Sequence, residues 1–60
     1  MAGRMIIEYA GQFDLPQDAY TVIEEHWEDG DEWSILEIID PTWQTWICLK
    51  HPDRIIYAIE

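Results

Sequence analysis

The pattern of apolar and polar residues divides the chain into one segment with helical periodicity and four segments typical of strands. Residues 14–29 separate into a polar and an apolar arc at about 100° per residue, the helical period. The polar arc carries the carboxylates of Asp14, Asp18, Glu24, Glu25, Glu28 and Asp29. As a strand, the same segment would place a charge on each face, because Glu24 and Glu25 are neighbours. The pattern therefore predicts an acidic amphipathic helix over 14–29.

The ends of this segment agree with a helix but leave one alternative open. Asp14 followed three residues later by Gln17 resembles a capping box, and Pro16 is tolerated in a first turn. Gly30 stands where a helix commonly ends. Asp29-Gly30 is also a hairpin signal, and a turn there would favour a small all-β barrel of five strands.

The remaining segments favour strands over 4–10, 32–39, 43–50 and 54–59. They are separated by turn signals at Gly11, Asp40-Pro41 and His51-Pro52-Asp53. We therefore expect a single α+β domain over residues 1–60, of order β-α-β-β-β. In it, one helix covers a four-stranded, mostly antiparallel sheet.

One helix covers only one face of such a sheet. Strand alternation would turn these residues toward the helix: Met5, Ile7, Tyr9, Trp43, Ile47, Leu49, Ile55, Tyr57 and Ile59. The other face would then carry Ile6, Trp46, Cys48 and Ile56. Exposed apolar patches of this kind usually mark interfaces, so we expect this face to form a homodimer or to receive a partner.

Composition adds a strong and uneven negative charge. The 60 residues include 13 acids and 3 Lys or Arg, for a formal net charge of −10, and no Lys or Arg lies between residues 5 and 49. The chain is nevertheless 48% hydrophobic, unlike a disordered acidic tail. A single cysteine excludes an internal disulfide and favours a reducing compartment, the cytoplasm. The apolar run Met5–Ile7 is too short for a signal peptide or membrane span, so we expect neither.

The sequence lacks the spacings of known catalytic and metal sites. Cys48, His26 and His51 do not form a paired zinc motif, and Asp29-Gly30-Asp31-Glu32 lacks the ligand spacing of an EF-hand. We expect no enzyme activity, no cofactor and no metal. Direct nucleic-acid binding is also disfavoured, because tryptophans that stack on bases need a cationic groove around them.

The acids themselves predict the function. Six carboxylates over about 22 Å of helix match one nucleic-acid strand, which has a phosphate about every 3.4 Å. We therefore expect a non-enzymatic protein that occupies the basic, nucleic-acid-binding surface of another protein, as a phage-type inhibitor of a CRISPR or restriction enzyme would. The predicted partner-binding residues are Asp14, Asp18, Glu24, Glu25, Glu28, Asp29, Asp31, Glu32 and Trp33. The alternative is a structural subunit that assembles through the apolar sheet face.

Overall fold

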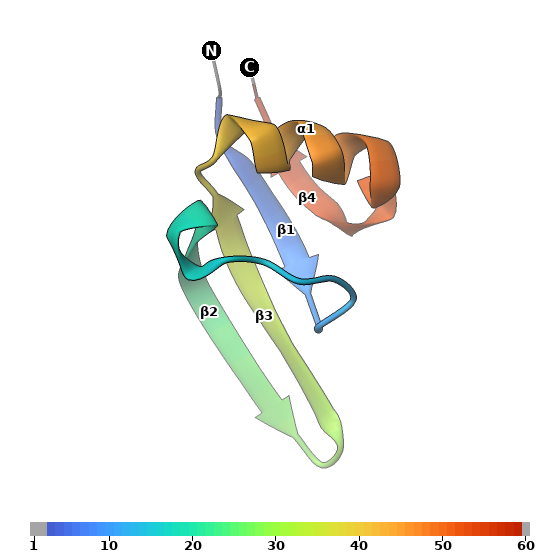
Figure 1. The fold of residues 1–60 in the computed structure, drawn as a ribbon. Helices are drawn as coiled ribbons and strands as arrows, with labels where there is room; N and C mark the ends of the chain where they lie inside the picture. The colour runs from blue at the N-terminus through green and yellow to red at the C-terminus, as the bar shows by residue number, and fades with distance from the viewer. Residues whose placement is uncertain (1–2, 60) are drawn as a thin grey trace.

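A computed structural model describes residues 3–59 as an open antiparallel sheet with a helix on one face (Figure 1). The elements, in chain order, are β1 (Met5–Tyr9), the 3-10 turn η1 (Gln17–Ala19), β2 (Tyr20–Glu28), β3 (Asp31–Ile38), α1 (Pro41–Lys50), the 3-10 turn η2 (Pro52–Arg54) and β4 (Ile55–Ala58). The four strands lie in the order β2-β3-β1-β4, and each neighbouring pair is antiparallel. The predicted α+β class, with one helix on a four-stranded sheet, is confirmed.

The position of the helix was predicted wrongly. Residues 14–29 form a loop, η1 and β2, whereas 43–50, expected as a strand, belong to α1. The order is therefore β-β-β-α-β, not β-α-β-β-β. The five-stranded barrel is also wrong, although its hairpin turn exists: β2 and β3 meet at Asp29-Gly30, where Gly30 has φ +83°.

Local chemistry explains why residues 20–28 form a strand. Thr21, Val22 and Ile23 are β-branched and favour extended backbone. The register with β3 shifts between Val22 and Glu24, which is a β-bulge. The bulge changes the alternation, so that Glu24 continues the face of Thr21. Charged residues at both odd and even positions therefore did not exclude a strand. Asp14 is no helix cap either, since η1 begins after Pro16 and has no side-chain cap.

The chain after β3 forms a helix because its first residues cap one. The Asp40 carboxylate accepts a hydrogen bond from the Thr42 backbone N–H at 2.8 Å, and Pro41 takes the first helical position. Asp40-Pro41, expected as a turn, is thus a helix start. Ile47 is fully buried, while Trp43 and Trp46 lie partly buried against the core, at the i, i+3, i+4 spacing of one helix face.

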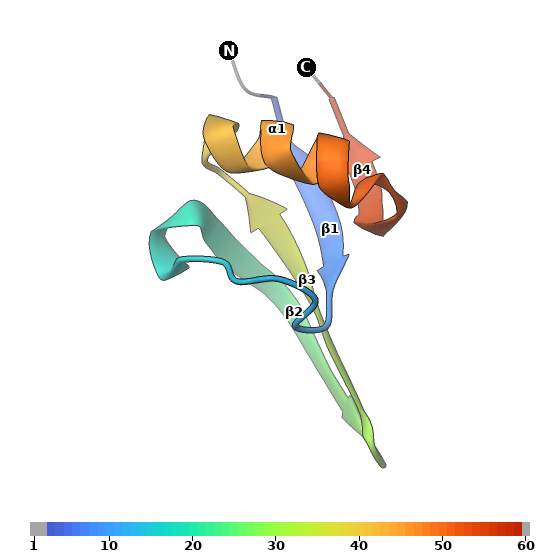
Figure 2. The same ribbon diagram turned by 45° about the vertical axis from the view of Figure 1, so that its right-hand side comes forward.

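The core lies between the sheet and α1. Its buried side chains are Met5, Ile7, Leu36, Ile38 and Ile47. The loop between β1 and β2 covers the same sheet face as α1, as Figure 2 shows, and Phe13 and Leu15 from this loop pack against the core. The backbone N–H groups of Ile39 and Asp40 donate to Ala19 O at 2.9 and 3.4 Å, which ties η1 to the start of α1.

Within residues 3–59, the opposite sheet face has no helix over it, as expected, but its residues differ from those predicted. Ile6 lies there, opposite Tyr57 and Glu37 of the neighbouring strands. Ile56 is on the edge strand β4, whereas Trp46 and Cys48 are on α1, on the other side of the sheet. The four residues of the predicted oligomer face therefore do not share a face. Tyr57 and Leu49, both expected beneath the helix, are exposed.

Over residues 3–59, no helix has the length and apolar character needed to cross a membrane.

Candidate functional site

The β2–β3 hairpin projects beyond the rest of the molecule. β1 pairs with β3 over Ser34–Ile38, whereas β2 continues along β3 as far as Asp31. The structure is accordingly elongated, with principal extents of 39 × 20 × 19 Å (Figure 1). We call residues 24–33 the acidic hairpin. Among the described residues, β1 does not pair with β3 beyond Ser34, and residues 27–32 at the outer end of the hairpin are all exposed.

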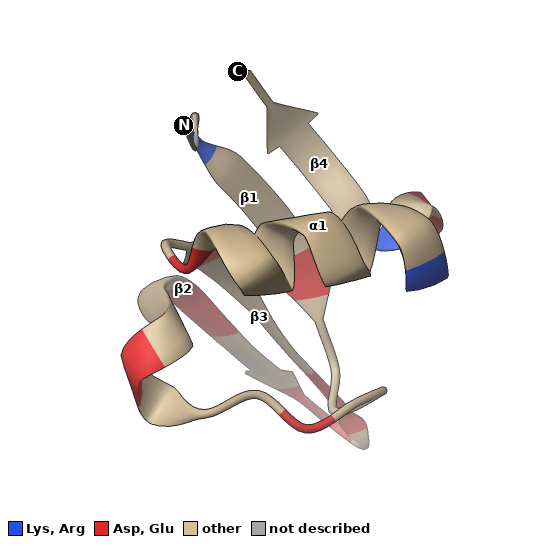
Figure 3. Ribbon diagram, turned by 45° about the horizontal axis from the view of Figure 1, so that its top comes forward, with Lys and Arg blue, Asp and Glu red and all other residues tan. Residues whose placement is uncertain are grey.

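The acidic hairpin concentrates negative charge. It carries six carboxylates and no Lys or Arg, and all six acids are exposed: Glu24, Glu25, Glu28, Asp29, Asp31 and Glu32. Strand alternation distributes them over both faces, with Glu24 and Glu28 on the open sheet face and Glu25 and Glu32 on the helix side. Figure 3 shows acidic residues at the hairpin end and on the rest of the molecule, while Lys and Arg lie near the N-terminus and around the end of α1, away from the hairpin end.

The two arginines pair with acids that lie outside the acidic hairpin, in the part of the molecule that we call the body. The Arg4 guanidinium donates two hydrogen bonds to the Glu37 carboxylate, at 3.0 and 3.1 Å. These bonds lower the pKa of Glu37 and raise that of Arg4. Arg54 Nη1 lies 3.6 Å from Glu8 Oε1, and Arg54 Nε lies 3.5 Å from Asp53 Oδ2. Among the described residues, the ion pairs thus leave the hairpin carboxylates without Lys or Arg partners.

Two tryptophans stand among these acids. Trp27 is 69% exposed, directly opposite Glu32 in the register. Trp33 is half-buried on the other face of the hairpin, where its ring stacks on His26 at 4.6 Å. His26 Nε2 also lies 3.5 Å from a Glu28 carboxylate oxygen. An exposed tryptophan inside a charged patch resembles the anchors of protein interfaces. In a helix over 14–29, Trp27 would lie on the apolar arc, whereas the observed strand leaves it exposed.

Most of the predicted partner-binding residues come together, but two do not. The acidic hairpin holds Glu24, Glu25, Glu28, Asp29, Asp31, Glu32 and Trp33. Asp14 lies in the loop after β1, and Asp18 is in η1, at the start of β2 and so at the opposite end of this strand from the turn. Both had joined the site only through the helix that the structure does not contain.

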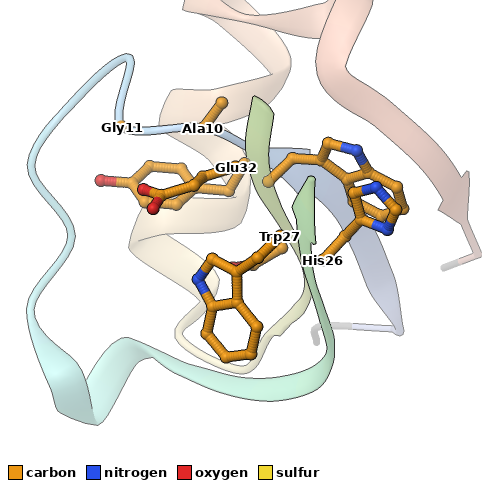
Figure 4. A pocket seen from close by; sticks show the side chains of 8 residues that line it. Ala10, Gly11, His26, Trp27 and Glu32 are labelled. Atoms are coloured by element: carbon orange, nitrogen blue, oxygen red, sulfur yellow. The ribbon is translucent and has the colours of Figure 1, made fainter. Parts of the chain in front are cut away.

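A shallow hollow of about 260 Å³ lies where the acidic hairpin meets the end of β1 (Figure 4). It is lined by Tyr9, Ala10, Gly11, His26, Trp27, Glu32, Trp33 and Ser34. The Tyr9 hydroxyl donates to the Phe13 backbone carbonyl, which fixes the phenol ring. Burial raises the pKa of Tyr9, and the nearby Asp14 charge raises it further. Tyr9 is therefore neutral near pH 7, and it lines the hollow as an uncharged phenol.

The cysteine and the second histidine lie outside the acidic hairpin. Cys48 is a free, exposed thiol on α1, and the His51 ring stacks on Phe13 at 4.5 Å. Within residues 3–59, no three His, Cys, Asp or Glu side chains are grouped so that they could hold a metal ion.

Comparison with known proteins does not extend this picture, since no family model, curated protein or solved structure matches the chain.

Proposed function

We propose that this protein is a non-enzymatic binding protein whose acidic hairpin enters a basic surface of another protein, in the place of a nucleic acid. The observation that carries the proposal is the projection of six exposed carboxylates on one narrow ribbon whose residues include no Lys or Arg. A projecting element can reach into a groove, which a flat acidic surface cannot do.

The charge density of the ribbon supports a nucleic-acid mimic, although the spacing differs from that expected for a helix. From Glu24 to Asp29 the hairpin spans about 16 Å at ~3.3 Å per residue. Over that length one DNA strand carries about five phosphates and a duplex about ten. Six carboxylates on the hairpin therefore lie between the two values. A basic groove that holds a nucleic-acid backbone would meet a comparable charge.

The hairpin would also determine how the complex forms. Unpaired exposed charges steer a basic partner over several ångströms and raise the rate of encounter. Because salt screens such charges, with a Debye length of about 8 Å at physiological ionic strength, binding weakens as salt rises. Trp27, exposed beside Glu32, supplies apolar contact that outlasts the encounter.

The most concrete form of this proposal is a phage-type inhibitor of a CRISPR or restriction enzyme. Such a protein would act in the cytoplasm, or in the host cytoplasm if viral. A lone exposed thiol, Cys48, suits that reducing setting.

Capture experiments with two charge-matched variants test the proposal. The hairpin variant carries Glu24→Gln, Glu25→Gln and Glu28→Gln. The control carries Asp14→Asn, Asp18→Asn and Asp53→Asn, which removes the same three charges outside the hairpin. Each immobilised protein is exposed to nuclease-treated lysate, and the bound proteins are eluted with duplex DNA and identified by mass spectrometry.

We expect the wild type and the control to capture the same basic, nucleic-acid-binding proteins, which DNA or high salt releases. The hairpin variant should capture few of them. The proposal is wrong if no basic protein is recovered, if DNA displaces nothing, or if both variants lose capture equally. The last result would mean that total charge matters and hairpin geometry does not.

A second candidate function, an assembling subunit, rests on β4. This edge strand has no charged side chain, and Ile56 and Tyr57 are 58% and 45% exposed. The other edge, β2, carries three glutamates that oppose strand addition. The occupant best suited to the β4 edge is a second copy of this chain. Pairing β4 with β4 would leave the acidic β2 edges about 34 Å apart, at ~4.8 Å per strand, well beyond the Debye length.

Sedimentation equilibrium tests this second candidate. The wild type should dimerise, Ile56→Lys should be monomeric, and Leu49→Lys, a matched change on the exposed side of α1, should dimerise like the wild type. A monomeric wild type, or equal effects of both lysines, would exclude β4 as the interface.

A further inference from the structure

Two neighbouring rungs of the sheet frame the hollow beside the acidic hairpin. Trp27 lies opposite Glu32, and Ser34 lies opposite Tyr9. Both rungs are on the helix side of the sheet, because Glu32 and Ser34 are two residues apart on β3. Directly opposite side chains have Cβ atoms about 4.5–5.5 Å apart. The hollow thus brings an indole, a phenol ring and a carboxylate within the reach of one small ligand (Figure 4).

At Ala10 and Gly11 the lining leaves the hollow open to a side chain from outside. After Tyr9 the chain turns at Gly11, whose φ is +83° and beside which nothing lies within 4 Å of where a Cβ would stand. Ala10 and Gly11 are both exposed and small. A ligand that enters here meets the rings and the carboxylate without first displacing a bulky residue.

The chemistry of the walls selects a cation. Aromatic faces attract Arg and Lys, most strongly when the ring is tryptophan. A carboxylate adds a charge-assisted hydrogen bond. Tyr9 presents its ring, since its hydroxyl already donates to the Phe13 carbonyl. Five further carboxylates on the same hairpin repel an anion.

The size of the hollow and the shape of the cation decide between arginine and lysine as the bound group. A hollow of about 260 Å³ is below the roughly 300–1,000 Å³ of pockets that hold drug-sized ligands, and it suits one side chain. Arginine fits better than lysine, because a planar guanidinium stacks on an indole while it donates two bonds to a carboxylate. We infer that the hollow formed by Tyr9, Trp27 and Glu32 binds one arginine side chain of the partner. The identity of that partner rests on the proposed function, but the site itself does not.

The site would give the complex a fixed register. The exposed carboxylates attract a basic surface from many directions, since unpaired surface charges fix no single geometry. One arginine held between Trp27 and Glu32 would orient the hairpin in the groove.

A titration with a blocked amino acid tests the site without a partner. The probe is Nα-acetyl-arginine methylamide, and its control is the citrulline analogue, which has the same shape and no charge. Two-dimensional NMR follows the Trp27 indole N–H and the Gly11 amide. Variants Glu32→Gln and Glu28→Gln each remove one carboxylate from the same hairpin, but Glu28 lies on the other face.

We expect the arginine probe to shift both signals and to bind at least about tenfold more tightly than the citrulline probe. Glu32→Gln should weaken arginine binding at least about fivefold, and Glu28→Gln less than about twofold. Trp27→Leu should abolish the preference for arginine. Preserved spectra of the variants establish that each one folds.

The inference is overturned if neither signal shifts, if both probes bind alike, or if the two glutamine variants lose binding equally. These outcomes differ from failure of the proposed function. Capture by the hairpin can survive loss of the arginine site, and the site can bind its probe even if lysate yields no basic protein.

Discussion

Replacing Ile47 with alanine tests the helix on which the whole core depends. Ile47 is fully buried on α1, among Met5, Ile7, Leu36 and Ile38, whereas Leu49 on the same helix is 74% exposed. If residues 43–50 formed a strand, positions 47 and 49 would face the same way and both would be buried. The pair Ile47→Ala and Leu49→Ala therefore distinguishes the observed helix from the strand that the sequence suggests.

The expected losses follow from burial. Ile47→Ala removes three buried carbons, worth about 2.4 kcal/mol at ~0.8 kcal/mol each. The cavity left behind brings the total into the range of roughly 2–5 kcal/mol. A 60-residue chain is stable by only about 3–9 kcal/mol, so this single change removes about a fifth of its stability or more. Leu49→Ala should change the free energy of unfolding by less than about 0.5 kcal/mol.

Urea unfolding followed by circular dichroism measures both variants. With a slope of about 1 kcal/mol per molar urea, Ile47→Ala should lower the midpoint by ~2 M or more, or unfold the protein without denaturant. Leu49→Ala should leave the midpoint almost unchanged. Equal losses in the two variants, or a larger loss for Leu49→Ala, would refute the helical assignment and the core built on it.

Three further changes test local features. Asp40→Ala removes the acceptor of the Thr42 N–H and should cost about 1 kcal/mol of unfolding free energy in the same urea assay, with loss of helical signal. Gly30→Ala should cost about 1–2 kcal/mol because φ is +83°, although the space is open; a smaller loss would mean that the turn relaxes. Because Arg4 lowers the pKa of Glu37, their pair stabilises the fold fully above the ordinary pKa of 4.5, and this contribution is lost as pH falls through the lower pKa of the folded state. Acid unfolding of Glu37→Gln should lack that component, and an unchanged acid profile would contradict it.

Three of the four strands could be predicted from the sequence. The segments at 4–10, 32–39 and 54–59 match β1, β3 and β4 to within a few residues. Each combines β-branched residues with nearby turn signals, so local preference and the final fold agree.

The sequence predicted a helix where residues 20–28 form a strand, and a strand where most of residues 41–50 form a helix, because local signals competed. The bulge at Ile23 breaks the alternation of β2, and only the paired strand reveals it. Beyond the bulge, no core lies against the hairpin to require one apolar face. In α1, bulky residues that favour strands, such as Trp43 and Ile47, led to the prediction of a strand. Asp40-Pro41 is compatible with a turn as well as with the start of a helix.

The clustering of the acids was predicted better than their secondary structure. Residues Glu24–Glu32 are contiguous in sequence, so their six carboxylates stay together whether the backbone is helical or extended. Asp14 and Asp18 depended on a helical period and are lost from the site. The exposure of Trp27 and the hollow beside Tyr9 depend on pairing between distant strands, which no local pattern contains.

The distribution of charge argues against solubility as the whole reason for the acidity. Solubility requires net charge but no particular location, and acids mixed with lysines over the body would provide it at less repulsion. Here Arg4 and Arg54 neutralise acids of the body, while the hairpin keeps six like charges within about 16 Å. Like charges facing one another across a strand pair are destabilising, as at Glu28 and Asp31. The fold thus keeps like charges together where it projects furthest, a cost that folding does not explain and that the proposed binding to a cationic groove would explain.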